Sequence, residues 1–222
     1  MKRLYGENII DLLPVNGGFV FAIQQAAYDD KVVILYKLYS FNTGVVSPIK
    51  KSIYLTAKFG PNYTNFENML MNYISCASLM LPDEKVLICN DDGTSDIFDK
   101  FGNILWSGKI SHNDEGPTNV ILCDDKFWCS FPKSGVISKY NTKNVKEELR
   151  FGGPGSIFTS PSGIIMNDGI LTICCSGTNK IYTLNTNSFE IDEYAEFSEP
   201  VYKYFKINSN EIVLLDSGIY RI

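Results

Sequence analysis

The feature that most constrains the fold is a group of short apolar runs that recurs along the chain with a fixed spacing. In residues 161–186, three such runs are separated by turns rich in Asn, Asp, Gly and Ser. Residues 117–142 show the same order of runs and turns. The prolines that open the two segments are 44 residues apart, and so are the Asn-Thr pairs that close them. Two independent markers therefore give one period, which indicates a repeat architecture.

Each repeat predicts four short strands, because turn signals follow one another every 8–12 residues. A four-stranded unit that recurs near forty residues is typical of a β-propeller blade. We therefore expect an all-β chain, with a single five-bladed β-propeller domain over residues 1–222. The predicted blades are residues 12–55, 72–110, 117–149, 161–197, and 200–222 together with 1–10.

The last predicted blade contains only three strands before the sequence ends at Ile222. The segment "MKRLYGENII" (1–10) precedes the first predicted blade, and we expect it to supply the missing outer strand. This pairing would close the ring and remove the free sheet edges on which other chains could add.

The spacing between the first two units is longer than the period, which predicts an insertion around residues 60–71. Apolar residues between Phe66 and Ile74 recur at helical spacing. Residues 64–72 are therefore either a short helix or a loop.

Composition and charge exclude several classes of function. The formal net charge is −5, and the few lysine pairs lie among acidic residues, so no basic stripe predicts nucleic-acid binding. No stretch approaches the roughly 20 apolar residues of a membrane span. Residues 1–18 lack the apolar core of a secretory signal, although a signal removed earlier is compatible with this. The six cysteines show no metal-binding spacing and several lie in apolar runs, which favours free buried thiols and a cytoplasmic location.

The segment "FGGPGSIFTSPSGIIMNDGILTICCSGTNKIYTLN" (151–185) resembles an NHL repeat, with its Pro-Ser-Gly-Ile, its Asp-Gly and its final Ser-Gly-x-Asn-Lys-Ile turn. The segment "LLDSGIYRI" (214–222) resembles the end of another such repeat. The resemblance implies a propeller; NHL propellers usually have six blades, whereas five are counted here. A small propeller with five blades is similar in architecture to tachylectin-type sugar-binding propellers.

No catalytic centre is visible in the sequence. His112 is the only histidine, so any Ser-His-Asp or Cys-His system would have to use it, and its polar surroundings predict a solvated loop residue. Trp128 is expected in the core between blades, and Trp106 on a partly exposed outer strand.

Candidate binding residues come from the topology that we predict. In a propeller, the turn between the second and third strands of a blade lies at the same end as the segment that enters its first strand. The polar and aromatic residues at these places form the candidate ligand-binding face: Asn90, Asp91, Asp92, Asn119, Lys133, Ser176, Thr178, Asn179, Tyr202 and Asp216. Most Asn and Asp residues among them also fit an ordinary role in turns. Oxygen ligands that converge from several blades would suit calcium, but no signature fixes a metal site or another cofactor.

The turn sequences differ from blade to blade, whereas a multivalent lectin would repeat its site. We therefore expect a non-enzymatic module that binds a protein or peptide on one face, because divergent loops on a rigid scaffold suit that role. The alternatives are a carbohydrate or small-molecule site in the channel, and a metal-dependent hydrolase similar to lactonase-type propellers.

Overall fold

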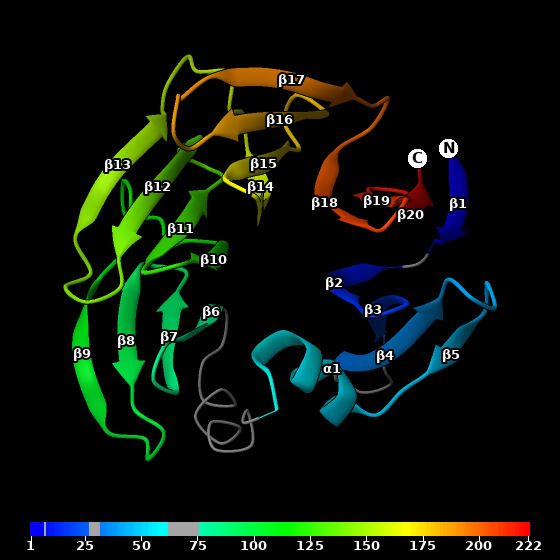
Figure 1. Ribbon diagram of the computed structural model, residues 1–222, viewed down its shortest axis with the longest axis horizontal. Coiled ribbons are helices and arrows are strands. Elements are labelled where there is room, and N and C mark those ends of the chain that lie inside the picture. The colour runs from blue at the N-terminus through cyan, green and yellow to red at the C-terminus, as the bar shows by residue number, and fades with distance from the viewer. Residues whose placement is uncertain (7, 27–31, 62–75) are drawn as a thin grey trace. The chain divides into compact units, whose positions relative to one another are not determined.

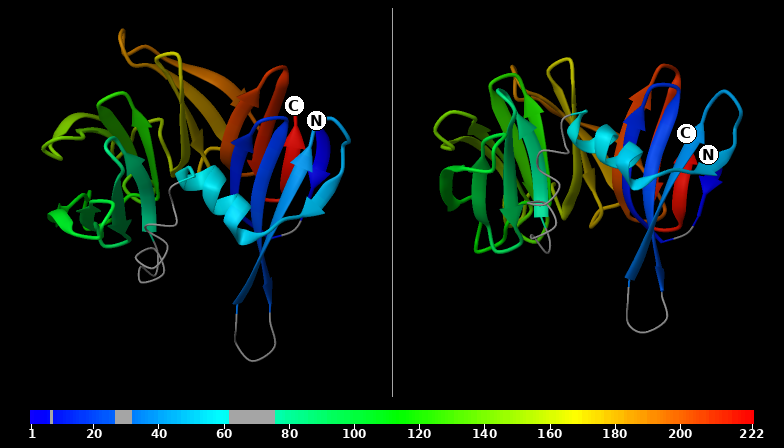
Figure 2. Two further views of the ribbon diagram at one scale, coloured as in Figure 1. Left: turned by 60° about the horizontal axis from the view of Figure 1, so that its bottom comes forward. Right: turned by 90° about the horizontal axis from the view of Figure 1, so that it is seen from below.

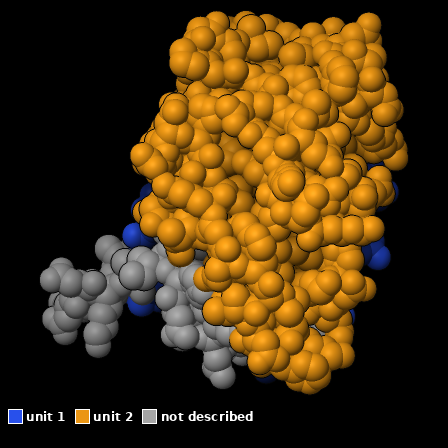
Figure 3. Space-filling model, turned by 90° about the vertical axis from the view of Figure 1, so that its left-hand side faces the viewer, with its two compact units in different colours: residues 1–63, 203–222 blue, residues 64–202 orange. Residues whose placement is uncertain are grey.

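The computed structural model describes residues 1–6, 8–26, 32–61 and 76–222. Its described strands form five four-stranded antiparallel sheets, the blades of a β-propeller, which confirms the predicted fold class (Figure 1). Contacts divide the chain into two compact units, coloured separately in Figure 3. Unit 1 comprises residues 1–63 and 203–222, and unit 2 comprises residues 64–202.

Unit 2 contains three consecutive blades, each an up-and-down meander. The strands of the first are β6 (Cys76–Leu81), β7 (Lys85–Asn90), β8 (Thr94–Phe98) and β9 (Ile104–Lys109). Those of the second are β10 (Asn119–Cys123), β11 (Lys126–Phe131), β12 (Val136–Asn141) and β13 (Glu147–Gly152). Those of the third are β14 (Pro161–Asn167), β15 (Ile170–Cys175), β16 (Lys180–Asn185) and β17 (Ile191–Glu196).

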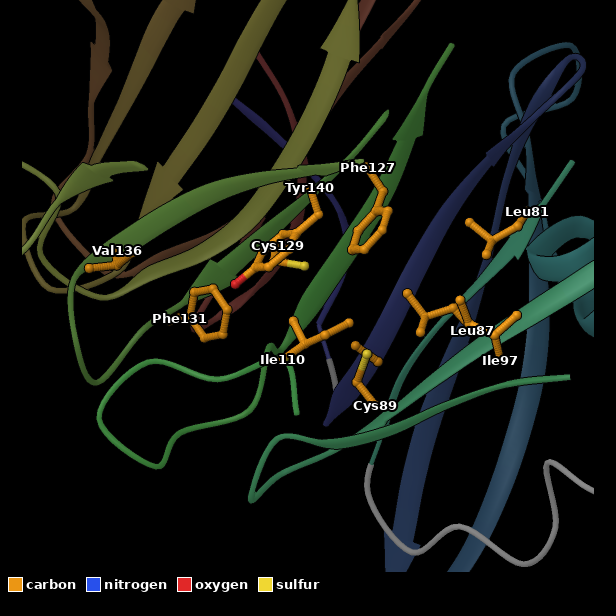
Figure 4. Packing of buried hydrophobic residues seen from close by; sticks show 11 residues of the cluster. Leu81, Leu87, Cys89, Ile97, Ile110, Phe127, Cys129, Phe131, Val136 and Tyr140 are labelled. Atoms are coloured by element: carbon orange, nitrogen blue, oxygen red, sulfur yellow. The ribbon is translucent and has the colours of Figure 1, made fainter. Parts of the chain in front are cut away.

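Strand β11 shows how the sequence places these blades against one another. Successive side chains of a strand point to opposite faces. Phe127, Cys129 and Phe131 accordingly join one buried cluster with residues of β7 and β8 (Figure 4). Trp128 points the other way, into a cluster with residues of β14 and β15, and it is 1% exposed. Both faces of β11 are therefore buried, and the prediction that Trp128 packs in the core is confirmed.

Unit 1 contains one complete blade and one that is assembled from both ends of the chain. The complete blade comprises β2 (Ile9–Val15), β3 (Gly18–Ala26), β4 (Val32–Ser40) and β5 (Val46–Pro48), and is followed by helix α1 (Lys51–Phe59). The assembled blade has the order β1-β20-β19-β18, with β1 (Lys2–Tyr5), β18 (Val201–Ile207), β19 (Asn210–Leu215) and β20 (Gly218–Arg221).

The N-terminal strand completes the last blade, as the sequence predicts. Strand β1 pairs antiparallel with β20, and the two chain ends lie side by side (Figure 2). Strand β3 then joins the two blades of unit 1, because Phe21 packs on Tyr5 at 4.7 Å and Phe19 on Phe205 at 6.1 Å between ring centroids. Its alternate residues Val20 and Ala22 face Tyr54 of α1.

Two local expectations are corrected. The N-terminal contribution to the last blade ends at Tyr5, and Ile9 begins the first strand of the first blade, although the sequence placed the start of that blade at residue 12. The last strand of that blade, expected to run to residue 55, ends at Pro48 and gives way to α1. Tyr54 and Phe59, five residues apart, are both buried on this helix. The question of a helix over residues 64–72 falls outside the described residues.

Candidate functional site

In unit 2, the turns between second and third strands pack against the segments that connect successive blades. Gly116 in the connection donates its N–H to the carbonyl of Asp91 at 2.7 Å. A Cβ at Gly116 would lie 1.9 Å from the carbonyl oxygen of Asn90, so the close approach requires glycine. Ser176 likewise donates to the carbonyl of Ser160 at 3.0 Å. We call the surface formed by residues 91–93, 112–116, 132–135, 153–154 and 176–179 the turn face.

Glu115 organises the centre of the turn face. Its carboxylate is buried, with the residue 6% exposed, and it accepts the backbone N–H groups of Lys133 and Ser134, both at 2.8 Å. The Ser134 hydroxyl donates to the carbonyl of His112 at 3.1 Å. The β11–β12 turn is therefore fixed by a carboxylate from the preceding connection, which satisfies backbone donors that would otherwise be costly to bury.

A groove of about 450 Å³ lies beside Glu115 and the β11–β12 turn that it fixes. Lys133 is exposed, and within the described part of the chain its ammonium group makes no ion pair. Asp114, which also lines the groove, is paired with Lys109 at 2.6 Å, on the surface. The groove therefore presents one uncommitted positive charge beside amide, hydroxyl and carboxylate groups. Its lining residues are Asn113, Asp114, Glu115, Lys133, Ser134 and Pro154.

The predicted residues of the β7–β8 turn serve the turn itself. Asn90 donates to the Thr94 hydroxyl at 2.9 Å, and Asp92 accepts both the backbone N–H and the hydroxyl of Thr94, at 2.8 and 2.7 Å. The hydrogen bonds from Thr94 lower the pKa of Asp92 below its ordinary value. Asp91 is exposed, and its carbonyl anchors the next connection.

The β15–β16 turn carries three further predicted residues. Ser176 bonds to the Ser160 carbonyl through both its N–H and its hydroxyl. The carbonyl of Asn179 accepts the N–H of Phe197 at 2.9 Å. The Thr178 hydroxyl is buried and finds no partner among the described residues. The turn is thus held to the connections on both sides.

The remaining predicted residues lie elsewhere. Asn119 begins β10 and donates its side-chain amide to the carbonyl of Ser162 on β14, so it joins two inner strands. Tyr202 lies in β18 and is half-buried. Asp216 is exposed in the β19–β20 turn of unit 1, beside Ser217, whose carbonyl accepts a hydrogen bond from Arg3 at 2.7 Å. The structure therefore brings Asp91 and Lys133 together around the connection that carries Glu115.

Two residues of the turn face differ from what the sequence suggests. Nothing in the sequence distinguishes Glu115, which is buried, from its exposed neighbour Asp114 in the same polar loop. His112, predicted to be solvated, is only half-exposed, and its ring lies 6.3 Å from that of Phe131 between centroids. Its Nδ1 is buried and has no partner in the described part of the chain. The backbone bridge between His112 and Glu115 folds the loop back on itself. Trp106, on the outer strand β9, is half-exposed as predicted.

The described residues contain no group of three or more His, Cys, Asp or Glu side chains that could hold a metal ion. Cys123, Cys129 and Cys175 are free thiols. Burial raises the pKa of the Cys175 thiol to about 12, which makes it a poor nucleophile. In the described part of the chain, no helix is long and apolar enough to span a membrane.

No protein-family model matches the sequence, and neither does the sequence of a curated protein. The resemblance to NHL repeats therefore stays a prediction.

Solved structures are similar to nearly the whole chain. Sqt1 from Saccharomyces cerevisiae is 12% identical, with a TM-score of 0.56 over 96% of this chain and 71% of Sqt1. The WD40 β-propeller domain of Doa1 is 11% identical, with a TM-score of 0.56 over 96% of this chain and 62% of that one. Streptogramin B lyase is 12% identical, with a TM-score of 0.52 over 98% of this chain and 69% of the lyase. At this level of identity the likeness establishes the β-propeller fold alone.

Proposed function

We propose that the protein is a non-enzymatic binding module, and that it recognises a protein or peptide partner through the turn face. The observation that carries the proposal is the pairing of a rigid backbone with an uncommitted charge at Lys133. Buried Glu115 fixes the turn, so the backbone at Lys133 loses little freedom on binding. The exposed ammonium group is then available to a carboxylate of the partner.

The composition of the groove supports a peptide over a sugar. The six lining residues include no aromatic ring, and they offer both donors and acceptors, as a peptide backbone requires. The surrounding turns also differ in sequence between the three blades of unit 2, so the face carries no repeated sugar site. The similar solved structures include a lyase, so the fold does not decide between binding and catalysis, and the proposal depends on the site.

A peptide-display selection tests the proposal. Random 16-residue peptides are selected on the immobilised full chain and counter-selected on the Lys133→Glu variant, and the affinities of the recovered peptides are measured by fluorescence anisotropy. We expect recovered peptides to contain acidic residues, and Lys133→Glu to weaken their binding about tenfold or more, because a charge-assisted hydrogen bond is replaced by repulsion.

The matched control is Lys143→Glu, since Lys143 is also exposed but lies in the β12–β13 turn at the other end of the same blade. Binding within about twofold of the original chain is expected for this variant. Equal weakening by both substitutions would overturn the proposal. So would a selection that yields no peptide while a glycan array or a panel of lactones shows specific binding or turnover.

A further inference from the structure

A second polar cluster, in unit 1, lies outside the turn face. Asp11 on β2 accepts hydrogen bonds from Tyr54 of α1 and from Lys203 of β18. The ammonium group of Lys58, also on α1, lies 3.2 Å from the same carboxylate. Helix α1 packs on β2, β3 and β4 (Figure 2). The helix that follows the first blade therefore brings two polar side chains to the first strand of that blade.

The cluster holds more positive than negative charge. Tyr54 is neutral, because burial, and then the charge of Asp11, raise the pKa of its phenol. Two ammonium groups thus face one carboxylate, although the whole chain carries a net charge of −5. Each ammonium group has three N–H donors. Among the described residues, Asp11 alone accepts from Lys58, and Asp11 and the carbonyl of Leu12 accept from Lys203.

The inner strands of unit 2 are joined in a different way. There Asn119 of β10 donates its side-chain amide to the carbonyl of Ser162 on β14. A neutral hydrogen bond therefore suffices to join the first strands of two blades in unit 2. The second ammonium group beside Asp11 is therefore not required to join the strands. Both lysine side chains can be reached from solvent, since that of Lys58 is 32% exposed and that of Lys203 is 26% exposed.

The spacing of the two ammonium groups matches a carboxylate. Asp11 already bridges them, with Oδ1 toward Lys203 and Oδ2 toward Lys58. We propose that Lys58 and Lys203 form a binding site for a second carboxylate, presented by a small organic acid, which bridges the same two ammonium groups from the solvent side. Such a ligand balances the charge of the cluster and accepts hydrogen bonds from the remaining N–H donors of the two lysines. This site is separate from the turn face and does not depend on the function proposed for it.

Succinate is a suitable probe. The full chain is titrated with sodium succinate at constant ionic strength, with chloride as the reference anion, and binding is followed by the 13C-ε NMR signals of the lysines. We expect saturable shifts confined to two lysine signals, and an increase in melting temperature with succinate. Lys58→Gln should weaken binding about tenfold or more, because one charge-assisted bond is lost. Lys58→Arg, which keeps the charge, should retain measurable binding.

Lys50→Gln is the matched control, because Lys50 is exposed just before the same helix and does not contact Asp11. Circular dichroism of each variant verifies that it is folded, and Lys58 is chosen because it is the more exposed of the two lysines. Absence of saturable shifts would overturn the proposal. So would equal affinity in Lys58→Gln and the original chain, or saturable binding of inorganic phosphate without any binding of succinate.

Discussion

At the scale of single residues, Glu115 shows how one buried acid shapes a surface. It accepts two backbone N–H groups of the β11–β12 turn. Glu115→Ala should lower the free energy of unfolding by about 2 kcal/mol, because it leaves those donors without an acceptor. Urea denaturation measures the change, and hydrogen exchange should accelerate at Lys133 and Ser134. Asp114→Ala is the control: its side chain is 90% exposed, and a change within about 0.5 kcal/mol is expected. Equal effects of the two substitutions would contradict the role of Glu115 in fixing the β11–β12 turn.

Asp11 gives a prediction about pH. Burial acts to raise its pKa, but Lys203, Lys58 and the hydrogen bond from Tyr54 outweigh burial and hold the pKa well below its usual range. Because the pKa is lower in the folded chain than its value of about 3.9 in the unfolded chain, the ionised group stabilises the fold above about pH 4. That contribution is lost as the pH falls further.

Asp11→Asn should therefore lower the free energy of unfolding by about 2 kcal/mol at pH 7. Breaking a fully buried ion pair typically costs about 3–5 kcal/mol, and we expect a smaller loss here because both lysines are partly exposed. The difference from the original chain should stay constant from pH 7 to 5 and shrink below pH 4. Denaturation at a series of pH values measures it, and a difference that grows on acidification would contradict this account.

Local sequence could not identify these two residues. The loop around Glu115 contains Asp114 as well, and only the turn some 18 residues further along decides which acid is buried. Asp11 becomes special through Lys203, which lies 192 residues away in the chain. Asp92, by contrast, has its partner two residues away, so its role in the turn was predictable from local chemistry.

At the scale of elements, β1 is the segment whose placement has the largest consequence. Deletion of residues 1–5 leaves β20 as a bare edge and removes the contact of Tyr5 with Phe21. We expect the melting temperature to fall by roughly 10 °C, as a loss of about 3 kcal/mol would produce in a chain of this size. Deletion of Met1 alone, which is 71% exposed, should have little effect. An unchanged melting temperature after the longer deletion would contradict the role of β1.

The strands of unit 2 were predictable because each turn carries its own signal. The first blade was harder to predict for two local reasons. A proline is a signal against a strand interior, and β2 contains Pro14, although Asn16-Gly17 after it is a strong hairpin signal, with Gly17 at a φ of 76°. Helix α1 follows a strand of only three residues, so its short apolar run was read as a continuation of that strand.

At the scale of the whole molecule, the sequence period predicts five four-stranded sheets and the structure confirms them. The period can be recognised in the sequence because turn residues and apolar runs determine the structure of their own short segments. The residues of a binding surface do not recur with such a period. The turn face depends on which connection reaches which turn, and its partner must be identified by experiment.

Hydrogen exchange of the full chain, with and without a display-selected peptide, tests directly whether the turn face binds a partner. We expect the peptide to slow exchange in residues 112–116 and 132–135, and to leave the β12–β13 turn at the other end of the blade unchanged. Protection confined to that opposite turn, or to the outer strands, with no change in residues 132–135, would contradict it.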